Sequence, residues 1–264
     1  MKKAVCIGVS YPGTKHHLHK AHDDALKMRD LLKNRYDYTD VKLLLDSDRP
    51  DVDARPTRKH ILRAIDDLVK GVSKGDRLVF HFTGHGTQQI EKSTGDRPRE
   101  DDDQDELIWP EDAVMDTIKD KYGNDSIRNA ILDNEIHDKL VEKMPTGAHL
   151  TIIFDCCHSG TAAGERIQVS ISACSDAQET LEFDTVGGLL VHYLYQVLAY
   201  KKFVGSYQEL FEELDRLLEG AYEKLKNRAR EDKAAKIRNT LANGDMHPIF
   251  SILGSHETTM KFSF

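Results

Sequence analysis

The residues best suited to chemistry stand in the segment 150–160, with the sequence LTIIFDCCHSG. Its first half is apolar and rich in β-branched side chains, which predicts a strand buried on both faces. An acid, two thiols, an imidazole and a hydroxyl follow from Asp155 to Ser159. Open α/β sheets place their ligand crevice at the carboxyl ends of strands, where these groups would lie. A thiolate there can attack a carbonyl carbon, so the segment predicts a cysteine nucleophile.

A second segment, 78–86 with the sequence LVFHFTGHG, repeats this order of an apolar strand followed by polar residues. It carries His85 between Gly84 and Gly86, an uncrowded setting for a base that must meet a substrate. One strand end with a thiol and another with an imidazole predict a nucleophile with a histidine partner. His158 is the rival base, but it adjoins the thiols in sequence, and neighbouring side chains at a strand end point apart.

Cys157, one of the two adjacent thiols, is a candidate nucleophile. A buried cysteine is more often a structural thiol than a nucleophile. A thiol becomes nucleophilic where a histidine or oriented backbone N–H groups favour the thiolate. Gly160 lets the backbone approach a substrate carbonyl closely, and the amides around Cys157 can form an oxyanion hole.

Composition bounds the class of protein. The 264 residues are 39% hydrophobic and 31% charged, as in soluble globular proteins. A formal net charge of −8 and the lack of a basic stripe argue against nucleic-acid binding. Four cysteines are too few for a disulfide scaffold, so we expect reduced thiols and a cytoplasmic protein. No apolar run approaches the roughly 20 residues of a membrane span, and the chain start predicts a strand rather than a signal peptide.

Strand-like and helical segments alternate along the chain, which predicts a mostly parallel sheet with helices on both faces. Strands are expected at 4–10, 41–46, 78–85, 150–154, 168–174 and 248–253, and helices at 18–36, 57–71, 133–144, 187–201 and 206–230. The polar and acidic segment 87–106 is expected to be a loop, and so is the segment 111–132, which shows no clean period. Without internal repeats or a Pro/Ser-rich linker, the chain is expected to form one domain.

The motifs at 155–160 (DCCHSG) and 82–86 (FTGHG) closely resemble those of the metacaspases, caspase-like cysteine peptidases of plants, fungi and protists. The resemblance continues at 23–25, where Asp-Asp-Ala stands in place of Asn-Asp-Ala, and reaches 172–179. It implies an α/β caspase-like three-layer fold with a mostly parallel central sheet. It also implies a single peptidase domain over 1–264, with a large-subunit-like part (1–166) and a small-subunit-like part (167–264).

The resemblance also implies roles for individual residues. Cys157 would be the nucleophile and His85 its partner, while Asp24 and Asp155 would line a pocket for an Arg or Lys side chain. Two carboxylates at one crevice favour a cation, and arginine can bind them bidentately. We therefore expect a monomeric endopeptidase that cleaves proteins or peptides after Arg or Lys.

An acidic run, EDDDQDE at 100–106, holds six acids in seven positions. Such runs are usually solvated loops, and this one lacks the glycine of an EF-hand. Dense oxygen ligands nevertheless suit calcium, and the metacaspases that this chain resembles commonly need calcium, bound by the matching loop. Asp101, Asp102 and Asp103 are the expected ligands, with Glu100 a weaker candidate. Gly164 stands where some relatives have an acid, which implies weaker binding.

Two other functions are compatible with these residues. A catalytically silent caspase-like scaffold could bind peptides without cutting them, although the presence of both Cys157 and His85 argues against it. A thiol-based metal or redox protein could use Cys156 and Cys157, but a zinc site needs further ligands that Cys6 and Cys174 do not obviously supply. Four histidines at 16, 17, 19 and 22 could bind a metal, but tandem histidines at a helix start are more often solvated.

Overall fold

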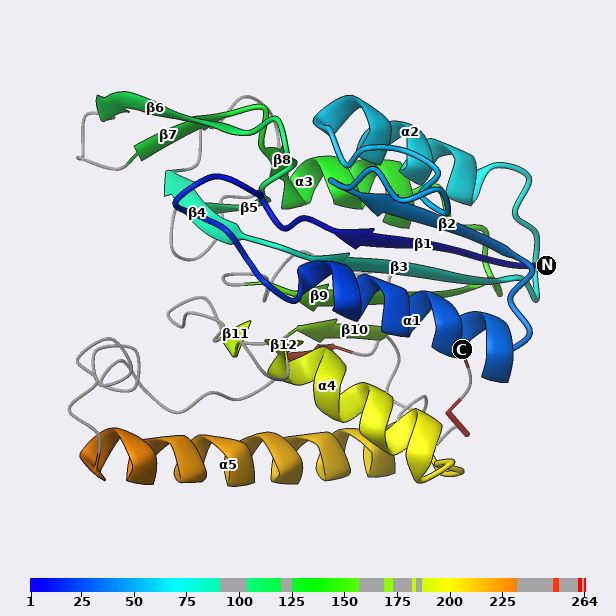
Figure 1. Cartoon of the computed structure of the whole chain (residues 1–264). Coiled ribbons are helices and arrows are strands. Elements are labelled where there is room, and N and C mark those ends of the chain that lie inside the picture. Colours follow the sequence, from blue (N-terminus) through cyan, green and yellow to red (C-terminus); the bar gives the residue numbers. More distant parts are fainter. Residues whose placement is uncertain are drawn as a thin grey trace.

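The computed structural model describes residues 1–90, 104–119, 125–156, 169–172, 182–183, 187–231, 249–251, 261–262 and 264. Its centre is a six-stranded sheet of order β13-β10-β9-β3-β1-β2 (Figure 1). The five parallel strands are β1 (Lys2–Gly8), β2 (Asp40–Leu45), β3 (Arg77–Thr83), β9 (His149–Asp155) and β10 (Val169–Ser172). Strand β13 (Ile249–Ser251) pairs antiparallel with β10. The predicted mostly parallel sheet is confirmed.

Helices cover both faces of this sheet (Figure 1). One face carries α1 (Ala21–Arg35), α4 (Leu189–Tyr195) with its π-helical continuation η2 (Gln196–Tyr200), and α5 (Tyr207–Glu231). The other carries α2 (Arg58–Val69) and α3 (Asp133–Ile136), which continues as the π-helical η1 (His137–Val141). The three layers confirm the predicted α/β class. The proposed division at residue 166 stays a prediction.

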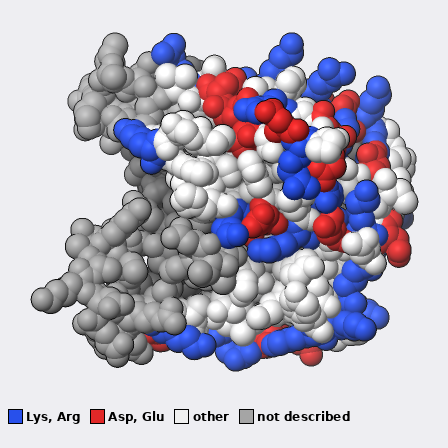
Figure 2. Space-filling model, viewed as in Figure 1, with Lys and Arg blue, Asp and Glu red and all other residues white. Residues whose placement is uncertain are grey.

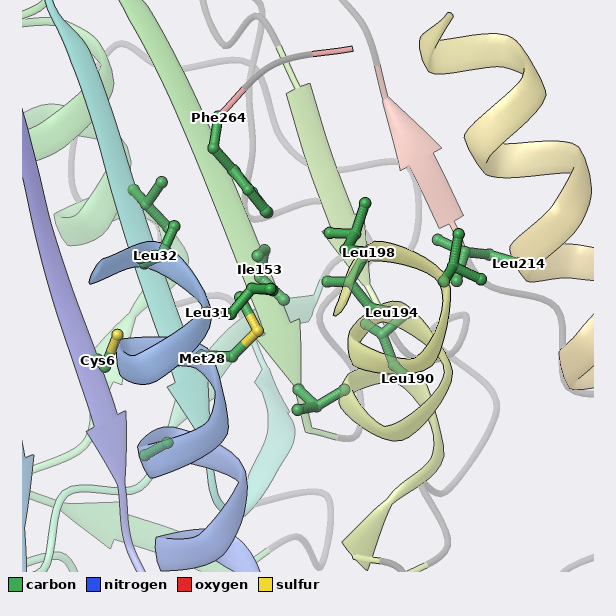
Figure 3. Packing of buried hydrophobic residues seen from close by; sticks show 14 of the residues in the cluster. Cys6, Met28, Leu31, Leu32, Ile153, Leu190, Leu194, Leu198, Leu214 and Phe264 are labelled. Carbon is green, nitrogen blue, oxygen red and sulfur yellow. The ribbon is translucent and has the colours of Figure 1, made fainter. Parts of the chain in front are cut away.

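Each face of the sheet has its own apolar core, because a parallel sheet must be buried on both sides. On the α1 side, Met28 and Ile153 belong to the same buried cluster as Leu194 and Leu214, so helices far apart in the sequence share one core (Figure 3). The opposite cluster contains Ile65 of α2, together with residues of β1, β3 and β9. The buried side chains of β3 and β9 on both faces of the sheet fix the position of the carboxyl ends of these strands.

Local signals explain several boundaries. Helix α2 begins after Thr57, whose hydroxyl accepts a hydrogen bond from the His60 N–H at 3.3 Å, as the predicted cap requires. Helix α1 begins at Ala21 rather than at the expected Leu18. The reason is that the Leu18 N–H donates to the Ser10 carbonyl at 2.9 Å and closes a β1–α1 loop before the helix.

The expectation of loops at 87–106 and 111–132 is wrong in part. Strands β4 (Gly86–Ile90), β5 (Gln104–Ile108) and β8 (Ile131–Leu132) form an antiparallel sheet, and β6 (Val114–Lys119) pairs with β7 (Asp125–Arg128). A further pair joins β11 (Glu182–Phe183) to β12 (Gly187–Gly188). The strands β4 to β8 extend beyond the carboxyl edge of the central sheet (Figure 1). Much of their sequence is polar, so main-chain pairing forms them without the apolar alternation that sequence analysis relies on.

The charges on the face drawn in Figure 2 are of both signs and interleave. Several of the molecule's ion pairs join separate elements: Lys139 and Lys143 both contact Asp66 of α2, at 3.0 and 3.2 Å. Exposed pairs of this kind contribute little to stability. Among the helices that the structure describes, none has both the length and the apolar character needed to cross a membrane.

Candidate active site

The carboxyl ends of β3 and β9 lie side by side at the centre of the sheet. Thr83 pairs in register with Asp155, so the residues that follow each strand start from the same edge. His85 comes two residues after Thr83, and Cys156 comes directly after Asp155. Cys157, the predicted nucleophile, lies outside the described residues. The prediction that the two motif-bearing strands end side by side is thus confirmed for the ends of β3 and β9.

The main chain of His85 is held from both sides. Its N–H donates to the Tyr11 hydroxyl at 3.0 Å, and its carbonyl accepts from the Trp109 N–H at 3.0 Å. The imidazole lies beside three rings, with centroid distances of 5.0 Å to Tyr11, 5.4 Å to Trp109 and 5.8 Å to His16. His85 is therefore a fixed and partly buried group, although glycines flank it in sequence.

One ring nitrogen of His85 has a defined partner. Nε2 lies 2.8 Å from the carbonyl oxygen of His16. Because a carbonyl oxygen can only accept, Nε2 carries the ring proton and Nδ1 is the acceptor of the neutral imidazole. Burial lowers the pKa of His85, which favours that neutral form. The arrangement gives one chemically available lone pair, at Nδ1, able to take a proton from a thiol.

Cys156 is unsuited to nucleophilic attack. It is only 1% exposed and packs in the apolar cluster on the α2 side of the sheet. Cys6 is also buried, but in the cluster on the opposite side, and burial raises the pKa of its thiol to about 12. The sheet separates these two thiols, so they cannot bind one metal ion together. This argues against a zinc site that draws on both Cys6 and Cys156, whereas the alternative that uses Cys156 with Cys157 stays open because Cys157 lies outside the described residues.

The two predicted substrate-reading carboxylates converge on the start of α4. Asp24 is fully buried and accepts a hydrogen bond from the Gly188 N–H at 2.9 Å. Asp155 is 3% exposed and accepts from the Val191 N–H at 3.1 Å. A Cβ atom on Gly188 would lie 2.0 Å from the Asp155 carboxylate, so only glycine fits between the two acids. Both acids therefore lie against the start of α4, while their role as a pocket for an Arg or Lys side chain stays a prediction.

A cation already lies beside one of these acids. Lys27, one turn further along α1, places its ammonium 2.8 Å from the Asp24 carboxylate. Burial raises the pKa of Asp24 to about 6, although Lys27 and the Gly188 N–H act in the opposite direction. Asp24 is thus a buried acid with a raised pKa, and the protein itself supplies one positive partner, Lys27.

Sequence reasoning missed several residues of this site. Tyr11 and Trp109 fix His85, and Gly188 and Val191 bind the two acids. Their contributions come mostly from main-chain groups, or from contacts between segments far apart in the sequence. One usable signal was Trp109, the single tryptophan of the chain, in a short apolar piece after a polar segment.

The predicted calcium ligands Asp101, Asp102 and Asp103, and the weaker candidate Glu100, lie outside the described residues. The structure does describe the two ends of the segment that carries them. Ile90 of β4 pairs with Gln104 of β5, so residues 91–103 begin and end at neighbouring positions. The acids therefore belong to the segment that joins β4, which follows His85, to β5, which leads to Trp109.

The four histidines before and in α1 have separate surroundings. His22 contacts Asp46 at 2.5 Å, and the ring of His16 lies edge-on to that of Trp109 at 5.2 Å. The ring centroids of His17 and His19 lie 4.4 Å apart, with the two rings tilted against each other. These contacts are with different partners, so no common metal site follows from them.

Comparison with known proteins agrees with this geometry. Residues 2–164 match the family model described as metacaspase, peptidase C14 domain. Metacaspase-1 of Yarrowia lipolytica is 40% identical over 162 residues, which cover 61% of this chain and 32% of that protein. Metacaspase-4 of Arabidopsis thaliana is 38% identical over 181 residues, 67% of this chain and 38% of that protein. The chain thus spans about a third of the length of these curated relatives.

Solved structures share the fold. The protein GSU0716 from Geobacter sulfurreducens superposes with a TM-score of 0.65 at 18% identity, covering 98% of this chain and 97% of its own. Caspase-1 from Spodoptera frugiperda superposes with a TM-score of 0.61 at 9% identity, covering 96% and 86%. At such low identities the likeness concerns the fold alone, and it confirms the caspase-like architecture expected from the sequence.

Proposed function

Because the chain belongs to the metacaspase family of cysteine peptidases, we propose that it is a cysteine endopeptidase that uses Cys157 and His85. The observation that carries the proposal is the bond between His85 Nε2 and the His16 carbonyl, 2.8 Å long. That bond leaves Nδ1 as a base at the edge of the sheet where β9 ends. The burial of Cys156 supports Cys157 as the thiol that reacts.

In the proposed reaction, His85 Nδ1 takes the thiol proton of Cys157, and the thiolate attacks the scissile carbonyl carbon. The imidazolium then gives its proton to the leaving amine as the C–N bond breaks, which leaves a thioester. Water attacks the thioester carbonyl and loses a proton to His85, and the acid product leaves with Cys157 restored as a thiol. The His16 carbonyl stabilises the transient positive charge through Nε2–H, while burial of His85 makes the imidazolium a ready proton donor.

We further propose that Asp24 and Asp155 select Arg or Lys on the acyl side of the cleaved bond. Support comes from the closeness of the two carboxylates, both buried beside Gly188. In a buried site a charge-assisted hydrogen bond to a guanidinium is stronger than in water, and two carboxylates can satisfy its planar fork. A substrate cation has to share Asp24 with Lys27, which already contacts it.

Calcium activation is the third part of the proposal. The residues between β4 and β5 carry the carboxylates of Asp101, Asp102 and Asp103, a donor type that calcium accepts in large numbers. When bound, calcium would hold these carboxylates together and would take no part in bond breaking. The support is the position of their connection: β4 follows His85 directly, and β5 leads to Trp109, whose N–H binds the His85 carbonyl.

A substrate panel tests the proposal. Purified protein would be incubated with fluorogenic peptides that end in Arg, Lys or Asp, in millimolar calcium, in magnesium and in excess chelator. Cleavage of the Arg and Lys peptides but not the Asp peptide, in calcium alone, is the expected result. No cleavage under any condition, with measurable binding of the Arg peptide, would favour the silent scaffold. Equal cleavage in chelator would remove the calcium part and leave the peptidase part standing.

A further inference from the structure

The loop between β1 and α1, residues 9–20, contacts His85 at two independent points. The Tyr11 hydroxyl accepts the His85 N–H at 3.0 Å, and the His16 carbonyl lies 2.8 Å from His85 Nε2. One contact fixes the main chain of the histidine, and the other fixes its ring. The conformation of the loop therefore decides both the position of the imidazole and the location of its proton.

Tyr11 acts as a bridge. Besides accepting from His85, its hydroxyl donates to the Trp109 carbonyl at 2.6 Å, which ties the start of β4 to the end of β5. Burial raises the pKa of Tyr11 well above its usual range, so the phenol keeps the proton that this donation needs. A Cβ atom on Gly84 would lie 3.1 Å from this hydroxyl. It would lie still closer, 2.7 Å, to the Phe82 ring, so the glycine before His85 leaves room for both side chains.

Tyr11 needs help to hold this place, because its φ of 50° lies in the left-handed region that non-glycine residues rarely adopt. Asp46, at the end of β2, provides that help. Its carboxylate accepts the N–H groups of Ser10 and Tyr11, at 2.8 and 2.6 Å, and contacts His22. Burial opposes ionisation of Asp46, but these hydrogen bonds outweigh it and lower the pKa of the carboxyl. The charge is therefore kept where it anchors the loop.

We propose that Tyr11 and Asp46 are positioning residues for His85. Asp46 anchors the left-handed turn at Tyr11, Tyr11 fixes the main chain of His85, and the loop so held presents the His16 carbonyl to Nε2. The role in catalysis rests on the proposed peptidase function. The set of contacts itself is a property of the fold, which allows a test that does not need activity.

Tyr11→Phe is the central variant, because it removes only the bridging oxygen and keeps the ring against His85. The matched control is Tyr38→Phe, since Tyr38 is also buried and its hydroxyl has no hydrogen-bond partner among the described residues. On an Arg peptide we expect kcat to fall at least about tenfold in Tyr11→Phe, because both hydrogen bonds of the hydroxyl, to His85 and to Trp109, are lost, with KM unchanged. Equal kcat values in Tyr11→Phe and Tyr38→Phe would overturn the proposal.

Asp46→Asn tests the anchor, with thermal melting to show that the variant is folded. We expect a larger loss of kcat than for Tyr11→Phe, because a charged acceptor of two main-chain N–H groups is lost. The double variant Tyr11→Phe/Asp46→Asn should be no slower than Asp46→Asn alone, since the loss of the anchor already displaces the Tyr11 hydroxyl together with the rest of the loop. Losses that multiply would show independent effects and would contradict the coupling. If Asp46→Asn does not fold, Tyr11→Phe alone decides.

Imidazole NMR on isotope-labelled protein gives a readout that is independent of cleavage. The His85 signals are assigned by their absence in His85→Gln. We expect one tautomer, with the proton on Nε2, in the wild type and in Tyr38→Phe, and a mixture of both tautomers in Tyr11→Phe. If the wild type cleaves no peptide, the proposed function fails and this spectrum alone decides. An unchanged His85 tautomer in Tyr11→Phe would then overturn the positioning role.

Discussion

Replacing Asp24 with asparagine should stabilise the protein at neutral pH, because the pKa of Asp24 is raised from 3.8 to about 6 by burial. For an acid whose pKa is higher in the folded state, the unfolded chain loses its proton first. The contribution of Asp24 to the free energy of unfolding is therefore fully present below pH 3.8. It falls as the pH rises towards about 6 and stays lower above that pH. At about 1.4 kcal/mol for each pKa unit, the penalty at pH 7 is at most about 3 kcal/mol.

Asp24→Asn escapes this penalty, because its amide oxygen can still accept the Gly188 N–H without carrying charge. Lys27 loses its anionic partner, but its side chain is 32% exposed and can be hydrated. Thermal melting at pH 7 should show an increase of up to about 6 °C, given the size of the chain. The difference from wild type should vanish as pH falls below 3.8, where Asp24 is protonated in both the folded and unfolded states.

The same change should damage activity. Removing one partner of a desolvated charge pair costs about 2–5 kcal/mol, so kcat/KM on Arg peptides should fall by roughly thirtyfold or more. Asp23→Asn is the matched control, because that carboxylate is 50% exposed and pairs with Lys20 on the surface. It should change neither melting nor cleavage. An Asp24→Asn variant that melts lower at pH 7, or that keeps full activity on Arg peptides, would refute this reasoning.

Three further predictions concern other parts of the site. Gly188→Ala should lower the free energy of unfolding by about 1–3 kcal/mol, measured by urea titration, because its Cβ would lie 2.0 Å from Asp155; unchanged stability would contradict the close approach. Asp102→Ala combined with Asp103→Ala should abolish activation by millimolar calcium but spare slow alkylation of the nucleophile by iodoacetamide; persistent activation would exclude these ligands. The rate of that alkylation should fall on acidification only below pH 6.5, because burial lowers the pKa of His85 and the imidazole stays neutral to lower pH. A rate that already falls above pH 6.5 would contradict the buried setting.

The sequence was most informative where burial dictates residue type. The runs at 78–83 and 150–155 are apolar because β3 and β9 are buried on both faces, and this alone predicted two neighbouring strand ends with chemistry at them. Asp24 carried a similar signal, since it lies on the same helix face as Ala21, Ala25 and Met28 and is buried with them. An acid on an apolar helix face needs a partner, and the structure supplies one from residue 188.

The remainder depended on contacts that leave no local pattern. Tyr11 reaches His85 across 74 positions in sequence, and Gly188 reaches Asp24 across 164. Both contacts involve main-chain N–H groups, which every residue type except proline possesses, so composition cannot reveal them. Strands β4 and β5 were missed for a related reason, because they pair through main-chain groups and their sequences, GTQQI and QDELI, show little apolar alternation.

The central claim is that Cys157, and not its neighbour, forms the covalent intermediate. The most direct measurement is cleavage of an Arg peptide in calcium by Cys157→Ala and Cys156→Ala, with melting curves to show that both are folded. We expect no cleavage by Cys157→Ala and substantial cleavage by Cys156→Ala, whose thiol is buried in the apolar core and 1% exposed. Cleavage that survives in Cys157→Ala, or that is lost equally in both folded variants, would contradict the assignment.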